Sequence, residues 1–170
     1  MGKTSVKRIA FQKERTAFHE AGHILIHLLT GIKIKEENII ENDKQINVVI
    51  HDSYDLSQYN NYDLNDYTIM CLRAGSLAEQ YYCWTKCINY DPDISGNDLW
   101  QISRLFYEGK LKFKLRESFE IHIKGLEEET ERLIKTHWSF VEIIAKKLLI
   151  KEKLTVERIN ELWKHFQFTK

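Results

Sequence analysis

Two histidines four residues apart, His19 and His23, lie in a run of residues with helical period, Thr16 to Gly31. Four residues make about one turn of an α-helix, so both imidazoles are expected on one face of a helix. Glu20 completes a His-Glu-x-x-His pattern, in which two imidazoles bind one zinc ion while the glutamate faces a water molecule on the metal. The spacing therefore predicts a helix that carries part of a zinc site.

The same spacing has a simpler interpretation, which is an amphipathic helix with two histidines on its polar face. The surrounding residues favour the metal site, because the run is strongly apolar after His23 and buried imidazoles need partners. Gly22 weakens the middle of this helix, and a glycine there suits close approach by another backbone or by a ligand.

Charge and hydrophobic patterning restrict the class of protein. The 170 residues include 25 Lys and Arg and 25 Asp and Glu, so the formal net charge is zero. No stretch concentrates basic residues with interleaved aromatics, which argues against nucleic acid as a partner. No apolar stretch reaches the length of a signal peptide or a membrane span, so we expect a soluble, cytoplasmic protein with no membrane segment. Cys71, Cys83 and Cys87 are expected to be reduced thiols.

The pattern along the chain predicts a mainly α fold with a small β-hairpin or sheet. Helical periods predict helices over 6–30, with Gly31 as the C-cap, and over 64–84. Between them, 32–40 and 45–51 contain alternating or β-branched residues around the turn-forming residues 41–43, which predicts the hairpin. Further helices are expected over 95–107, 112–137, 140–149 and 155–166.

We expect a single domain over residues 1–170, because a chain of this length can bury a core without disulfides. The predicted zinc-site region covers about 6–109, and a C-terminal helical region covers about 112–166. The second long helix is expected to approach another helix closely through its small residues, which are Ala74, Gly75, Ser76 and Ala78.

A catalytic zinc ion needs a third protein ligand besides the two histidines. Asp98 follows the flexible Gly96 at the start of a predicted helix, and Glu79 lies on the second long helix, so either carboxylate is a candidate. Asp98 also fits a capping box with Ser95, in which its side chain accepts a hydrogen bond from a backbone amide. The residues alone leave these three interpretations open.

The other histidines do not extend the site. His27 lies about 12 Å along the helix from His19, too far to share one ion, so we expect it to pack or to act outside the metal sphere. Leu29 occupies the position of the third histidine of the extended metzincin motif, which excludes that class. The remaining histidines lack metal spacing and are expected to be surface or capping residues: His51, His122, His137 and His165.

Four segments match, in order, motifs of one known family. Thr16–Leu25 is similar to a Tyr-His-Glu-Ala-Gly-His-Ala helix, and Ala74–Gln80 to a Gly-Gly-Arg-x-Ala-Glu-Glu helix. Ser95–Leu99 is similar to Thr-Gly-Ala-x-x-Asp-Leu, with two residues fewer between Gly and Asp. Ile144–Leu154 is similar to an Ala-x-x-Leu-Leu helix followed by Glu-x-Leu. Over nearly its whole length, the chain thus resembles the peptidase domain of FtsH-type AAA zinc metalloproteases.

The resemblance implies a zincin-like metallopeptidase helical domain with zinc as its cofactor. It implies that His19, His23 and Asp98 are the zinc ligands, that Glu20 is the general base, and that Glu79 is a carboxylate outside the metal sphere. The implied activity is that of a zinc metalloendopeptidase, which hydrolyses peptide bonds of unfolded or extended polypeptide.

The family's ATPase domain has no counterpart in the sequence. No Gly-x-x-x-x-Gly-Lys-Ser/Thr pattern occurs, and 18 residues precede His19, so we expect a stand-alone peptidase that is ATP-independent by itself. An ATPase partner or a homo-oligomer stays open. Two other functions also stay open: a catalytically retired binding or regulatory module, and a peptidase specific for one regulatory partner. The intact pattern favours an enzyme, because a binding module has no need of Glu20 beside two ligands.

Overall fold

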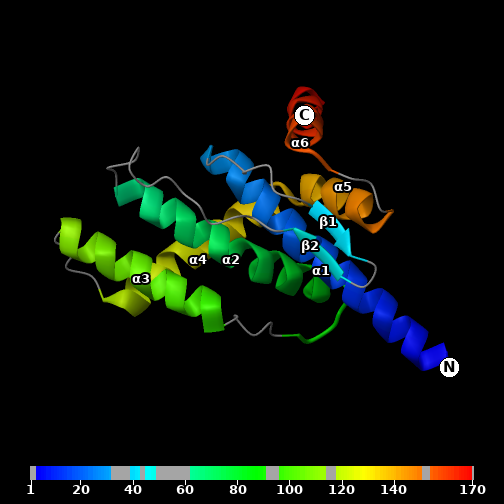
Figure 1. The fold of residues 1–170 in the computed structure, drawn as a ribbon, viewed down its shortest axis with the longest axis horizontal. Coiled ribbons are helices and arrows are strands. Elements are labelled where there is room, and N and C mark those ends of the chain that lie inside the picture. The colour runs from blue at the N-terminus through cyan, green and yellow to red at the C-terminus, as the bar shows by residue number, and fades with distance from the viewer. Residues whose placement is uncertain are drawn as a thin grey trace.

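The computed structural model describes residues 3–31, 39–42, 45–48, 62–90, 96–113, 118–150 and 154–169. In chain order, the elements are helix α1 (Lys3–Thr30), strands β1 (Ile39–Asn42) and β2 (Gln45–Val48), and helices α2 (Tyr62–Thr85), α3 (Gly96–Phe113), α4 (Phe119–Thr136), α5 (Trp138–Leu149) and α6 (Val156–Phe168). Helices α1 and α2 form the central pair (Figure 1). Helices α3 and α4 pack against α2, whereas α5 packs against α1.

Helices α1 and α2 approach closely because the residues at their contact are small. A Cβ atom at Gly22 of α1 would lie 2.5 Å from the carbonyl oxygen of Ala74 and 2.6 Å from the Cβ of Ala78, both on α2. Such distances leave no room for a methyl group, so the glycine is needed where the two backbones meet. The predicted close approach is confirmed for Gly22 and, on α2, for Ala74 and Ala78.

The largest hydrophobic cluster joins α1 and α2 to the two C-terminal helices. It includes Leu25 of α1, Ala78 of α2 and Ile144 of α5, which are all fully buried, and Ile159 of α6. Helices α5 and α6 therefore complete the core on which α1 rests.

Stacked aromatic rings strengthen the same cluster. The ring of Phe18 on α1 lies between those of Tyr82 and Trp138, with centroid distances of 4.1 and 5.3 Å and nearly parallel planes. Offset stacking of this kind adds to the apolar area that the rings bury. The stack connects α2, α1 and α5 one residue before the first histidine of the predicted zinc site.

A second cluster holds α3 and α4 against α2, and it consists of Ile69, Ile102, Leu105, Phe106 and Ile123. One polar pair accompanies it, since Nε2 of His122 on α4 lies 2.7 Å from Oδ1 of Asp66 on α2. The His122 side chain is only 10% exposed and the N-cap of its helix is Ser118, so the predicted surface or capping position of His122 is wrong. His137 does lie at a helix end, between α4 and α5, as predicted.

The sequence predicted a mainly α fold class that includes a small β-hairpin or sheet. This fold class is wrong. The packed layers of the described residues are all helical, and the two strands have four residues each. The strands pair antiparallel in a hairpin beside α1, with Ile39 opposite Val48 and Asn42 opposite Gln45. Two strands of this length bury too little surface to form a layer. The prediction was a zincin-like helical domain that includes a small hairpin or sheet. The structure supports a helical class instead.

The predicted helix ends agree closely for the central pair and less well for α3. Helix α1 ends at residue 30, and Gly31 adopts a φ of 71°, as predicted for a C-cap. Helix α3 continues through Gly109 to residue 113, beyond its predicted end at 107. Helix α4 consequently begins later than predicted, at residue 119, where the Ser118 side chain caps its first turn.

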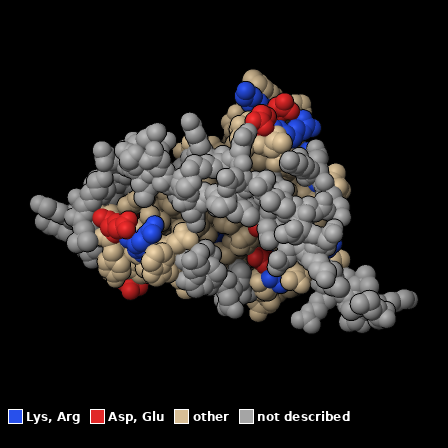
Figure 2. Space-filling model, in the orientation of Figure 1, with Lys and Arg blue, Asp and Glu red and all other residues tan. Residues whose placement is uncertain are grey.

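Charged side chains of opposite sign lie beside one another on the surface. Examples are Arg104 with Glu108 on α3, 3.6 Å apart, and Arg158 with Glu161 on α6, 2.9 Å apart. Figure 2 shows blue and red side chains next to each other on the face that it displays. Among the helices that the structure describes, none is both long and apolar enough to cross a bilayer.

Candidate metal centre

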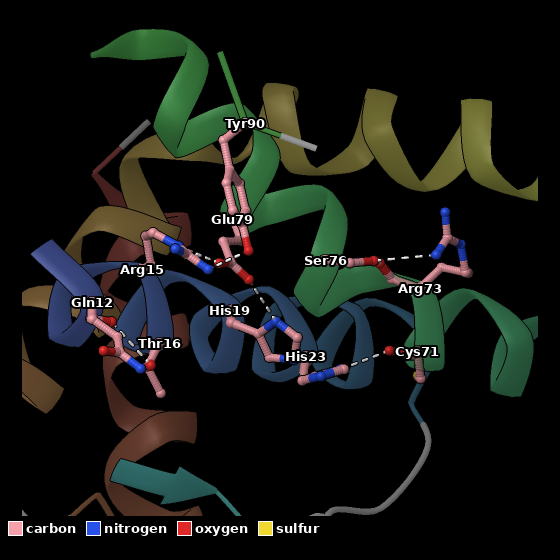
Figure 3. A network of polar contacts seen from close by, with 10 residues as sticks. All are labelled: Gln12, Arg15, Thr16, His19, His23, Cys71, Arg73, Ser76, Glu79 and Tyr90. Carbon is pink, nitrogen blue, oxygen red and sulfur yellow. Dashed lines mark hydrogen bonds and ion pairs between the residues drawn. The ribbon is translucent and has the colours of Figure 1, made fainter. Parts of the chain in front are cut away.

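The imidazoles of His19 and His23 lie together on the face of α1 that meets α2 (Figure 3). Their ring centroids are 4.8 Å apart, and their planes are inclined by 73°. Both Nε2 atoms lie against Gly75 of α2, where a Cβ atom would stand 2.4 Å from that of His23 and 2.5 Å from that of His19. The two nitrogens therefore converge on the same small space.

The ring of His23 is oriented by the main chain of α2. Its Nδ1 lies 2.7 Å from the carbonyl oxygen of Cys71, and because a carbonyl oxygen can only accept, Nδ1 must carry the hydrogen. Burial, assisted by the neighbouring His19, lowers the pKa of His23 to about 3. The ring is thus neutral at pH 7, with its proton on Nδ1 and a lone pair on Nε2, which is the form that binds a metal.

The ring of His19 is oriented by a side chain. Its Nδ1 lies 3.3 Å from Oε2 of Glu79 on α2, and Nε of Arg15 donates a hydrogen bond of 2.5 Å to Oε1 of the same carboxylate. Burial would raise the pKa of Glu79, but the hydrogen bonds from His19 and Arg15 outweigh burial and hold this pKa below its ordinary value. Glu79 is therefore an ionised acceptor at neutral pH.

These contacts fit a zinc ion in three respects. Each imidazole has an acceptor at Nδ1, which is how proteins orient metal-binding histidines and increase the basicity of the coordinating nitrogen. Both Nε2 atoms face one space, and Gly75 makes room for them where any side chain would collide. The His19 side chain is 33% exposed, so the ring pair is not fully enclosed by protein.

Glu20 follows His19 on α1 and is only 9% exposed. Packing therefore restricts the position of its side chain. His27, one helical turn beyond His23, is 2% exposed and lies in the core.

The predicted third ligand, Asp98, lies in the first turn of α3, but its side chain is outside the described residues, as is Ser95 of the predicted capping box. Among the side chains that the structure describes, no group of three His, Cys, Asp or Glu gathers around one point. Glu79 reaches Nδ1 of His19 rather than the side of Nε2.

The sequence did not mark Arg15 or the main chain of Cys71 as part of this site. Arg15 precedes His19 by one helical turn, so the spacing 15, 19, 23 carried a signal for a shared face. The Cys71 carbonyl carried none, because every residue type offers the same main-chain acceptor.

Comparisons of the chain with protein-family models, with curated proteins and with solved structures find no match.

Proposed function

We propose that the chain is a zinc-dependent metalloendopeptidase. The observation that carries the proposal is the paired arrangement of His19 and His23, whose Nδ1 atoms face fixed acceptors while their Nε2 atoms converge beside Gly75. In a surface helix that carries two histidines by chance, an acceptor at Nδ1 of both rings is not expected.

His19 and His23 would hold the ion, with Asp98 as the third ligand that we propose from the sequence. When bound, zinc lowers the pKa of its water toward 7 and polarises the scissile carbonyl. Glu20 accepts a proton from the attacking water and delivers it to the leaving amine, so that the peptide C–N bond breaks as the amine becomes neutral. The burial of Glu20 supports this role, because a carboxylate with restricted motion needs little reorganisation to transfer a proton.

The proposed substrate is unfolded or extended polypeptide. This assignment rests on the four ordered motifs that resemble FtsH-type peptidase domains, from Thr16–Leu25 to Ile144–Leu154. We place the enzyme in the cytoplasm because its three cysteines are free thiols, as is usual in a reducing compartment.

The test compares Glu20→Gln with the wild-type protein. The amide keeps the size of the side chain but cannot accept the proton, so we expect zinc at one ion per chain and a loss of casein cleavage by at least about 100-fold. Glu128→Gln is the matched control, because Glu128 is 68% exposed on α4, and it should cleave casein at the wild-type rate.

Two results would contradict the proposal. Wild-type protein that binds no zinc would remove the metal site. Protein that binds zinc yet cleaves no unfolded substrate, with or without Glu20, would favour a binding module instead.

A further inference from the structure

We propose that Arg15, held by Tyr90, is a positioning residue that fixes Glu79 and thereby the orientation of the His19 ring. This inference rests on the proposed zinc site. It adds that the orientation of the His19 ring depends on Arg15, whereas that of the His23 ring does not. Figure 3 shows the chain of contacts, from Tyr90 through Arg15 and Glu79 to His19.

The first step is the contact between Arg15 and Glu79. Nε of Arg15 donates to Oε1 at 2.5 Å, while Oε2 faces Nδ1 of His19 at 3.3 Å. Each carboxylate oxygen therefore has its own partner, and the two partners lie one turn apart on the same face of α1. A carboxylate with both oxygens engaged cannot rotate without breaking one of these contacts, so Arg15 limits where Oε2 can lie.

The second step is the contact between Arg15 and Tyr90. The guanidinium carbon lies 3.8 Å from the centroid of the Tyr90 ring, and Nη2 of Arg15 donates a hydrogen bond to the Tyr90 hydroxyl. Stacking and hydrogen bonding together restrict a side chain that otherwise has many rotamers. The Arg15 side chain is 25% exposed and Glu79 is 9% exposed, so the contacts are partly shielded from water.

The third step is the difference between the two rings. His23 is anchored to a main-chain carbonyl, that of Cys71, which is fixed by helix α2 itself. His19 is anchored to the end of a glutamate side chain, which has three rotatable bonds and needs a partner to stay in place. Arg15 supplies that partner, so the orientation of His19 alone depends on it.

The experiment uses the full chain and two readouts. The first is the zinc dissociation constant, measured by competition with a chromogenic chelator. The second is the tautomer of each ring in the metal-free protein, read from the imidazole ¹⁵N chemical shifts. The variants are Arg15→Gln, Arg15→Lys, Tyr90→Phe, Glu79→Gln and the double variant Arg15→Gln with Glu79→Gln. Arg132→Gln is the control, since Arg132 pairs with Glu129 on the exposed face of α4.

We expect Arg15→Gln to weaken zinc binding about tenfold, the size of effect usual for partners of metal-binding histidines. In the metal-free variant, His19 should lose its preference for the Nδ1–H tautomer while His23 keeps it. Tyr90→Phe keeps the stacked ring and loses the hydroxyl, so it should give a smaller loss in the same direction. Arg15→Lys keeps the charge without the planar fork and should restore part of the affinity. Arg132→Gln should match the wild type.

The double variant separates positioning from a general effect. If Arg15 acts through Glu79, Arg15→Gln should cost nothing further once Glu79 is Gln. Independent, multiplying losses would overturn the inference, and so would an unchanged His19 tautomer in Arg15→Gln. Should that variant fail to fold, Arg15→Lys gives the same decision, because it alters the contact with Glu79 and leaves Tyr90, which itself interacts with Glu79, unchanged. Wild-type protein without zinc affinity would remove the proposed function, while the tautomer readout would still decide the role of Arg15.

Discussion

Gly75 of α2 and His23 of α1 are in such close contact that a Cβ atom on the glycine would lie 2.4 Å from Nε2 of the imidazole. The same atom would lie 2.5 Å from Nε2 of His19. The two rings can therefore converge only because residue 75 has no side chain. Gly75 lies in another helix, 52 residues after His23 in the sequence.

Gly75→Ala should consequently separate the two imidazoles. We expect zinc affinity to fall by at least about tenfold, because the methyl group displaces the Nε2 atoms that we propose as zinc ligands. The variant should stay folded by circular dichroism and lose about 1–3 kcal/mol of unfolding free energy through overpacking. Gly125→Ala is the matched control, since Gly125 lies in α4 with nothing within 4 Å of its added Cβ, and it should raise stability by up to about 1 kcal/mol. Unchanged zinc binding in Gly75→Ala would contradict the site.

Gly22→Ala should weaken the packing of α1 on α2. The added methyl group would collide with the Ala74 carbonyl oxygen and the Ala78 side chain, neither of which can move without shifting α2. We expect a loss of about 1–3 kcal/mol in the free energy of unfolding measured in urea, in spite of the better helix propensity of alanine. A variant as stable as the wild type would show that the two backbones do not approach this closely.

Thiol reactivity tests the burial of α2. Burial raises the pKa of Cys71 to about 12, although its hydrogen bond with Thr30 acts in the opposite direction, and burial also raises the pKa of Cys83. Cys87 is exposed after the end of the helix. Ellman's reagent should therefore titrate one thiol rapidly in the native protein and all three in denaturant. Rapid reaction of a second thiol in the native state would contradict the packing of α2.

The stability of the metal-free protein should fall in mild acid because of His23. Its pKa is about 3 in the folded protein and about 6.5 in an unfolded chain, so between these values only the unfolded chain binds the proton. The free energy of unfolding is therefore unaffected by protonation of His23 above pH 6.5, and it decreases as the pH falls from 6.5 toward 3. We expect the urea midpoint to drop between pH 7 and pH 5, and to drop less in His23→Asn. Equal pH dependence in the two proteins would show that His23 is not desolvated.

The sequence predicts the central helix pair well, because apolar period, Gly31 and the small residues of α2 agree with one another. It predicts the end of α3 poorly. The helix was expected to end at residue 107, but it continues through Gly109 to residue 113, although a glycine inside a helix costs about 1 kcal/mol relative to alanine.

For the site, the sequence alone selects His19, Glu20 and His23, and it marks Glu79 as a carboxylate of interest. It cannot reveal that Glu79 reaches Nδ1 of His19, because that contact depends on the register of α2 against α1. The anchor of His23 is beyond any sequence pattern, since its acceptor is main chain.

The packing of α5 on α1 limits how far this protein can be shortened. A fragment ending at residue 113 would contain both histidines, Glu20, Glu79 and Asp98, yet it would leave Leu25 and the rest of the apolar side of α1 in water. We expect such a fragment to aggregate. Transfer of this site to another scaffold therefore also requires an element that covers the apolar side of α1 as α5 does.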